Sequence, residues 1–78
     1  MHIKFTIPEA HTVLAVMHDG TGKVIVLYRR DEAQARRYVT GCSAAIGGDV
    51  TNPSHFDQFR DAKLSFAVRA GLLPRARA

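Results

Sequence analysis

The sequence predicts an α+β fold of order β-β-β-α-α, in which two amphipathic helices pack against a three-stranded antiparallel sheet. Apolar residues recur with a period of about two over residues 2–29 and of about 3.6 from residue 31 onward, as in strands and helices respectively. The connections between the strands are short, which favours antiparallel neighbours. We therefore expect one small domain over residues 1–73 and a frayed basic tail over residues 74–78.

Residues 2–7 are the first predicted strand, because apolar and polar residues alternate strictly. Ile3, Phe5 and Ile7 share one face, so this strand is expected to be half-buried. Pro8 follows and has no N–H group to donate to a neighbouring strand, so the strand is expected to end there.

The next two strands, residues 12–18 and 23–29, are predicted to form a hairpin. The connection Asp19-Gly20-Thr21-Gly22 contains two glycines that can adopt positive φ, as short hairpin loops require. Both strands carry apolar residues on both faces, which is typical of strands that are covered on both sides.

The first helix is predicted to begin at Asp31, where Asp31 and Gln34 form a variant of the capping box. Gly47 and Gly48 provide its C-terminal end. Gly41 lies inside this helix and is explained by close packing against a neighbouring element. The apolar stripe consists of Ala35, Tyr38, Val39, Cys42, Ala45 and Ile46.

The second helix is predicted to begin with Asn52 as N-cap and Pro53 at the first helical position. Gly71 and then Pro74 end it. Leu64 and Val68 lie four residues apart and fall outside its main apolar face. That face consists of Phe56, Phe59, Ala62, Phe66, Ala67 and Ala70.

Composition restricts the classes of protein. No apolar run approaches the roughly 20 residues of a membrane helix, so no membrane association is expected. The N-terminus lacks the apolar region of a signal peptide, and a single cysteine cannot form a disulfide framework. These features predict a cytoplasmic protein.

Motifs for catalysis, cofactors or metals are missing from the sequence. Gly20-Thr21-Gly22-Lys23 does not match a phosphate-binding loop, because Val24 stands where Ser or Thr would hold magnesium. The four histidines lack metal-ligand spacing. Cys42 lies in the predicted buried stripe, where a thiol behaves as a small apolar group. We expect a non-enzymatic protein without a cofactor or metal.

Arginines form the main candidate binding site. Arg29, Arg30, Arg36 and Arg37 fall within nine residues and should lie on one exposed side of the strand–helix junction, near Tyr28 and Tyr38. Arg75 and Arg77 add charge in the tail, and the formal net charge is +4. This pattern suits phosphate contacts with an aromatic ring available for stacking, so nucleic-acid binding is the first functional hypothesis. Ordinary solvated arginines, half neutralised by Asp31 and Glu32, are the alternative.

A surplus of apolar residues leads to the second functional hypothesis. Two short helices are expected to be too few to cover both faces of the hairpin, and large exposed apolar patches usually mark interfaces. Leu64, Val68 and Tyr28 are the candidate interface residues. We expect a homodimer, and as the alternative function a small regulator or inhibitor that binds an acidic protein partner through its apolar surface and arginines.

Overall fold

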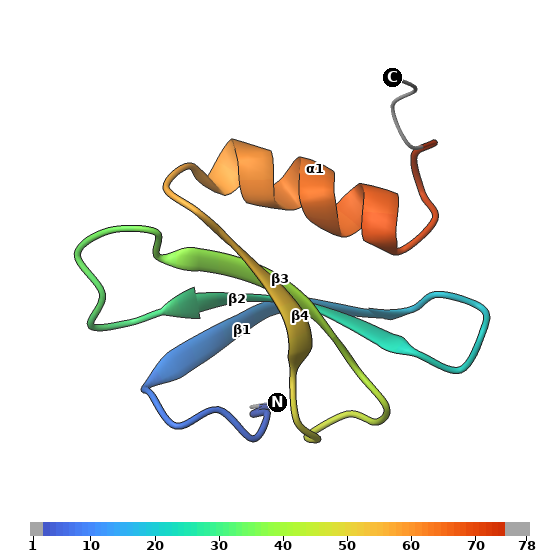
Figure 1. Cartoon of the computed structure of the whole chain (residues 1–78), viewed down its shortest axis with the longest axis horizontal. Coiled ribbons are helices and arrows are strands. Elements are labelled where there is room, and N and C mark those ends of the chain that lie inside the picture. The colour runs from blue at the N-terminus through green and yellow to red at the C-terminus, as the bar shows by residue number, and fades with distance from the viewer. Residues whose placement is uncertain (1–2, 75–78) are drawn as a thin grey trace.

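The computed structural model describes residues 3–74, and these form a four-stranded antiparallel sheet and a single helix (Figure 1). The strands lie side by side in the order β1-β2-β3-β4, so each strand pairs with its neighbour in sequence. The elements are β1 (His11–His18), β2 (Val24–Arg30), β3 (Tyr38–Ser43), β4 (Thr51–Phe56) and α1 (Phe59–Arg69). The α+β class is as expected, but the predicted order β-β-β-α-α, with three strands and two helices, is wrong.

The hairpin of β1 and β2 agrees with the prediction. Asp19 N–H donates to the Lys23 carbonyl at 3.1 Å, and the Asp19 carboxylate accepts the N–H and hydroxyl of Thr21. Gly20 and Gly22 have positive φ. These hydrogen bonds lower the pKa of Asp19, with the Thr21 hydroxyl making the largest contribution.

The predicted first helix is replaced by a turn region followed by β3. Val39 and Thr40 are β-branched and Gly41 is a poor helix former, so Tyr38–Ser43 suits a strand. The edge of β2 that faces away from β1 also needs a partner for its backbone N–H and C=O groups. Strand β3 supplies this partner in a continuous antiparallel register from Val24↔Ser43 to Arg29↔Tyr38. The spacing of the apolar residues imitated a helix by coincidence.

The predicted start of the second helix is also a strand. Asn52 has φ of 50° and Pro53 lies within β4, so the Asn-Pro pair begins no helix here. Helix α1 begins seven residues after Asn52, at Phe59, and Gln58 at its N-cap makes no side-chain capping bond. The C-terminal end agrees with the prediction: Gly71 has φ of 80° and its N–H donates to the Val68 carbonyl.

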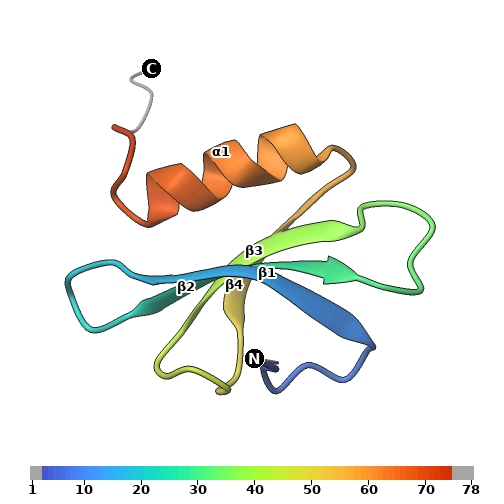
Figure 2. The same ribbon diagram turned by 180° about the vertical axis from the view of Figure 1, so that it is seen from behind.

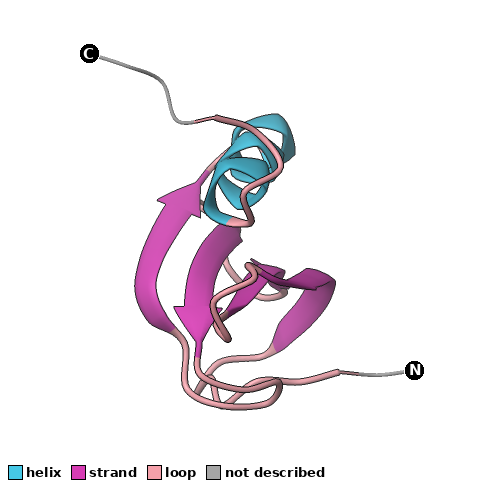
Figure 3. Ribbon diagram, turned by 90° about the vertical axis from the view of Figure 1, so that its right-hand side faces the viewer, coloured by secondary structure: helices cyan, strands magenta, loops and turns pink. Residues whose placement is uncertain are grey.

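The two faces of the sheet are covered by different parts of the chain (Figure 3). We call the face carrying Val24, Val26 and Tyr28 the N-terminal face, because residues 3–7 lie across it. We call the face carrying Ile25 and Leu27 the helix face, because α1 contacts β2, β3 and β4 there.

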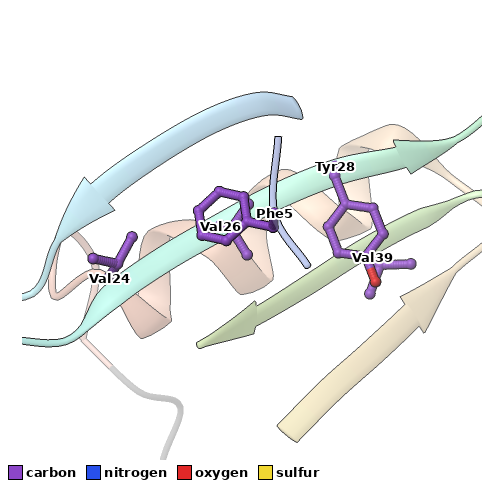
Figure 4. Packing of buried hydrophobic residues seen from close by; sticks show 5 residues of the cluster. All are labelled: Phe5, Val24, Val26, Tyr28 and Val39. Carbon is purple, nitrogen blue, oxygen red and sulfur yellow. The ribbon is translucent and has the colours of Figure 1, made fainter. Parts of the chain in front are cut away.

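Of the predicted strand at residues 2–7, the described residues 3–7 form no strand, and Thr6 makes one isolated parallel bridge to Asp49. The alternation of apolar and polar residues still determines the packing of this segment, since Ile3, Phe5 and Ile7 all face the core. Phe5 is only 5% exposed and lies over Val26, with Val24, Tyr28 and Val39 around it (Figure 4). Thr6 anchors the segment by hydrogen bonds to the carbonyls of Gly47 and Gly48.

Helix α1 covers its face of the sheet incompletely. Ala62 is fully buried, and the Ser65 hydroxyl meets the Thr40 hydroxyl at 2.9 Å. Within residues 3–74, the helix contacts β2, β3 and β4 but does not contact β1. With 11 residues, α1 is too short to span a membrane, and no other helix occurs in the described part of the chain.

Candidate functional site

The first two arginines of the predicted cluster point to opposite faces of the sheet, because successive residues of a strand alternate. Arg29 lies on the helix face, where its Nε is 3.2 Å from Asp31 Oδ1. Arg30 lies on the N-terminal face, where its Nε is 3.0 Å from the Glu9 carboxylate and its Nη1 donates to the Arg36 carbonyl. The expectation that all four arginines share one exposed side is therefore wrong.

Asp31 is held in place by Thr12 as well as by Arg29. The Thr12 hydroxyl lies 2.8 Å from Asp31 Oδ1 and 2.9 Å from Oδ2. The Thr12 hydroxyl makes the largest contribution to lowering the pKa of Asp31; desolvation opposes it, and the Arg29 guanidinium lowers the pKa further. The carboxylate therefore stays ionised beside Arg29 and neutralises it.

The other two arginines lie in the connection between β2 and β3. Arg36 is exposed and has φ of 50°, and its N–H donates to Asp57 Oδ1 at 2.7 Å. Arg37 is half-buried, and its Nε is a buried donor without a hydrogen-bond partner among residues 3–74. Arg75 and Arg77 lie outside the described residues.

The tyrosines near the arginines are already engaged. Tyr28 is 5% exposed and its ring meets the His11 ring edge-on at 5.7 Å, so Tyr28 belongs to the core and is not an interface residue of the folded chain. Tyr38 packs against Phe59 with ring centroids 5.3 Å apart. Tyr28 is therefore unavailable for stacking on a base, and the half-buried Tyr38 ring is already in contact with Phe59. The arginine cluster is thus split between two faces and contacted by three carboxylates.

A groove at the other end of β2 is the second candidate site. It has a volume of about 750 Å³ and lies between α1 and the helix face of the sheet. Ile25 and Cys42 from neighbouring strands line its floor, while Leu64 and Val68 line the helix side. Leu64 is 51% exposed. Leu64 and Val68, which the sequence analysis assigned to an interface, therefore both border this groove.

Arg69 gives this groove a positive charge. The side chain is half-buried; its Nη2 donates to the Ser54 hydroxyl at 2.7 Å and its Nη1 is 3.5 Å from Cys42 Sγ. Both partners are neutral. The ion pairs among residues 3–74 involve Arg29 and Arg30, so Arg69 has no direct counter-charge in a groove with both polar and apolar lining residues.

Sequence reasoning missed Arg69 and the floor of the groove. Cys42 was expected to lie inside a helix stripe, but it is a half-buried strand residue at the groove. Arg69 follows Ser65 by four residues and therefore lies near the same side of α1. That spacing was visible in the sequence, but its meaning depended on knowing that β3 is a strand.

Comparisons of the chain with protein-family models, with curated proteins and with solved structures give no significant match.

Proposed function

We propose that this protein is a non-catalytic protein-interaction module that binds an apolar, acidic segment of a partner in the groove beside α1. The observation that carries the proposal is Arg69, a half-buried cation with neutral partners, next to the apolar side chains of Leu64 and Val68. A buried or half-buried charge without a counter-charge is unfavourable, so a carboxylate from a partner would improve its environment.

The rest of the groove restricts the chemistry of this partner. Ile25, Leu64 and Val68 offer apolar contacts, and the Lys23 ammonium adds a second positive group at the rim. The Asp19 carboxylate, which accepts two hydrogen bonds from Thr21, also lines the groove and offsets one of these two positive charges, so the lining keeps a net positive charge. An apolar side chain that enters the groove, with a Glu or Asp close to it, matches this arrangement.

A pair of short peptides tests the proposal without knowledge of the natural partner. One peptide carries leucine and glutamate, and its matched control carries leucine and lysine. We expect the acidic peptide to shift the amide resonances of Ile25, Ser65 and Val68 in a two-dimensional NMR titration, whereas the basic peptide leaves them unchanged. Equal shifts with both peptides, or with neither, would contradict the proposed charge preference.

Variants of the groove sharpen this test. Leu64→Ser should weaken binding of the acidic peptide by roughly tenfold, because one well-placed apolar contact contributes on the order of 1–2 kcal/mol. Leu72→Ser is the matched control, since Leu72 is similarly exposed but does not line the groove. Arg69→Gln should also weaken binding and should reduce its dependence on salt. Unchanged affinity in both groove variants would place binding elsewhere.

Nucleic-acid binding is the second candidate function, supported by the exposed Arg36 and the adjacent half-buried Arg37, neither of which forms an ion pair within residues 3–74. A phosphate could accept from both guanidinium groups. Against this proposal, Asp31 and Glu9 neutralise Arg29 and Arg30. The geometry therefore supports it less well than the groove.

A salt titration of DNA and RNA binding decides this second candidate. If phosphates are bound, Arg36→Ala/Arg37→Ala should weaken binding to all sequences and reduce the salt slope by roughly one per lost contact. Arg60→Ala, which removes an exposed arginine on α1, is the control. Absence of binding by the unaltered protein at low salt would exclude nucleic acid as the ligand.

A further inference from the structure

The two outer strands of the sheet differ in their ability to accept another strand. Strand β4 is blocked: Pro53 has no N–H group, Asn52 has φ of 50°, and the pairing of β4 with β3 is shifted between Thr40 and Cys42. Each of these features disturbs the regular row of backbone donors and acceptors that an added strand requires. The β4 edge is therefore protected.

Strand β1 lacks such protection along most of its length (Figure 2). Its sequence, His-Thr-Val-Leu-Ala-Val-Met-His, contains no proline, Lys, Arg, Asp or Glu. A bulge between Val13 and Ala15 is its single irregularity, and Ala15–His18 pairs regularly with β2. Leu14 and Met17 are 38% and 37% exposed. An outer strand with free backbone groups and exposed apolar side chains favours pairing with another strand.

We propose that β1 pairs antiparallel with β1 of a second copy of this chain, joining two sheets into one continuous sheet. A second copy supplies a strand that is equally long and equally free of charge. The net charge of +4 adds little repulsion at the start of this edge, because the two arginines opposite His11 and Thr12 are paired with Glu9 and Asp31.

The register of this pairing follows from the alternation of side chains. In an antiparallel pair, directly opposite residues point to the same face of the sheet. A two-fold axis perpendicular to the sheet must therefore lie between one residue and the same residue of the second copy. An axis at Val16 places Val16 opposite its own copy on the N-terminal face. It also places Met17 opposite Ala15 of the second copy on the helix face, where the small alanine leaves room for the larger methionine.

Sedimentation equilibrium of the full chain tests whether the second copy binds. We expect a concentration-dependent species of twice the 8.6 kDa chain mass. Met17→Lys should weaken this association by at least about tenfold, because each dimer would bury two new charges. Ile46→Lys is the control, since Ile46 is exposed in the connection between β3 and β4 and should leave association unchanged. A strictly monomeric protein at millimolar concentration would overturn the proposal.

A cysteine cross-link tests the register and remains informative if Met17→Lys does not fold. In a Cys42→Ser background, Val16→Cys should oxidise readily to a disulfide-linked dimer, because directly opposite Cα atoms lie about 4.5–5.5 Å apart. Thr51→Cys on the β4 edge is the control and should give no disulfide-linked dimer, although it still associates through β1. A dimer that persists in Met17→Lys and gives no Val16→Cys cross-link would show that β1 is not the interface.

This proposal does not depend on the groove beside α1. Leu64→Ser should leave the sedimentation result unchanged while it weakens binding of the acidic peptide. The two proposals can therefore fail separately, and loss of self-association in Leu64→Ser would contradict pairing through β1.

Discussion

Gly41 illustrates how a single residue controls the packing of this domain. It lies opposite Val26 in the register of β2 and β3, and a Cβ atom there would collide with the Val50 side chain. Val50 itself packs against the core of the N-terminal face. The absence of a side chain at residue 41 therefore allows the β3–β4 connection to approach the sheet.

We expect Gly41→Ala to destabilise the protein by about 1–3 kcal/mol, because the added methyl group overpacks a well-filled region. Urea unfolding followed by circular dichroism measures this free energy. Ala44→Ser, at an exposed neighbouring position, is the control and should change stability by less than about 0.5 kcal/mol. A stabilised Gly41→Ala variant would show that Val50 moves away without loss.

Tyr28 links burial to stability at alkaline pH. Burial raises its pKa above the usual value of 10.0, and the Glu9 carboxylate acts in the same direction while Arg30 opposes it. The folded state therefore holds the phenolic proton more tightly than the unfolded chain. Its contribution to stability is fully present below pH 10 and is lost as the pH rises through the folded-state pKa.

We accordingly expect the free energy of unfolding to fall as the pH rises above the usual tyrosine pKa of 10.0. Urea unfolding at a series of pH values measures this dependence. Tyr28→Phe removes the titrating group and should flatten the profile in this range. The same alkaline loss in Tyr28→Phe would assign it to other groups.

The elements were predictable from sequence to different degrees. The β1–β2 hairpin was predicted correctly because its loop chemistry and apolar strands lie close together in the chain. The helix predicted from Pro53 to Gly71 includes α1 (Phe59–Arg69), but its start was placed too early; its end was predicted correctly because Gly71 ends the helix through local backbone geometry. Strand β3 was missed because its partner β2 determines its conformation: Tyr38, Val39 and Cys42 have helical spacing, but Thr40 and Gly41 suit a strand.

The candidate sites depended on these element assignments. Leu64 and Val68 were identified as surface apolar residues from the helix pattern alone, and both border the groove. The arginine cluster was visible as a sequence pattern, yet its neutralisation was not, because Glu9 is 21 residues away from Arg30 in the chain. Long-range ion pairs of this kind leave no periodic signal.

Asp57 joins two elements that the sequence places far apart. Its carboxylate accepts the Arg36 N–H at 2.7 Å, so the β2–β3 connection is attached to the turn that precedes α1. We expect Asp57→Ala to destabilise the protein by about 1 kcal/mol through loss of this hydrogen bond to a charged acceptor. Thermal unfolding of Asp57→Asn, which keeps an acceptor oxygen, should show a smaller loss. Equal losses in both variants would indicate a role for the charge itself.

At the scale of the whole molecule, the fold depends on a segment that has no regular secondary structure. Residues 3–7 cover the N-terminal face, while α1 covers the helix face. In a chain of 78 residues, the sheet alone could not exclude water from both sides. The N-terminal segment takes the place of the second helix predicted from the sequence.

Phe5 is the residue through which this segment contributes most to stability. Its side chain is 5% exposed, packs with Val26 and Tyr28, and is fixed by the backbone hydrogen bond from Phe5 N–H to His11 Nε2 at 3.2 Å. Replacement of a buried phenylalanine by alanine typically costs about 3–5 kcal/mol. Small domains have a total stability of about 5–15 kcal/mol, so Phe5→Ala should leave a large unfolded fraction at moderate temperature.

Urea unfolding of two variants measures this contribution. Phe5→Leu keeps much of the apolar volume and should remain folded with a loss of roughly 1–2 kcal/mol, so it reports on the site even where Phe5→Ala is too unstable. Lys4→Ala, at the exposed neighbouring residue, should change stability by less than about 0.5 kcal/mol. Stability that is unchanged in Phe5→Ala would mean that residues 3–7 are dispensable and that another part of the chain covers the N-terminal face in solution.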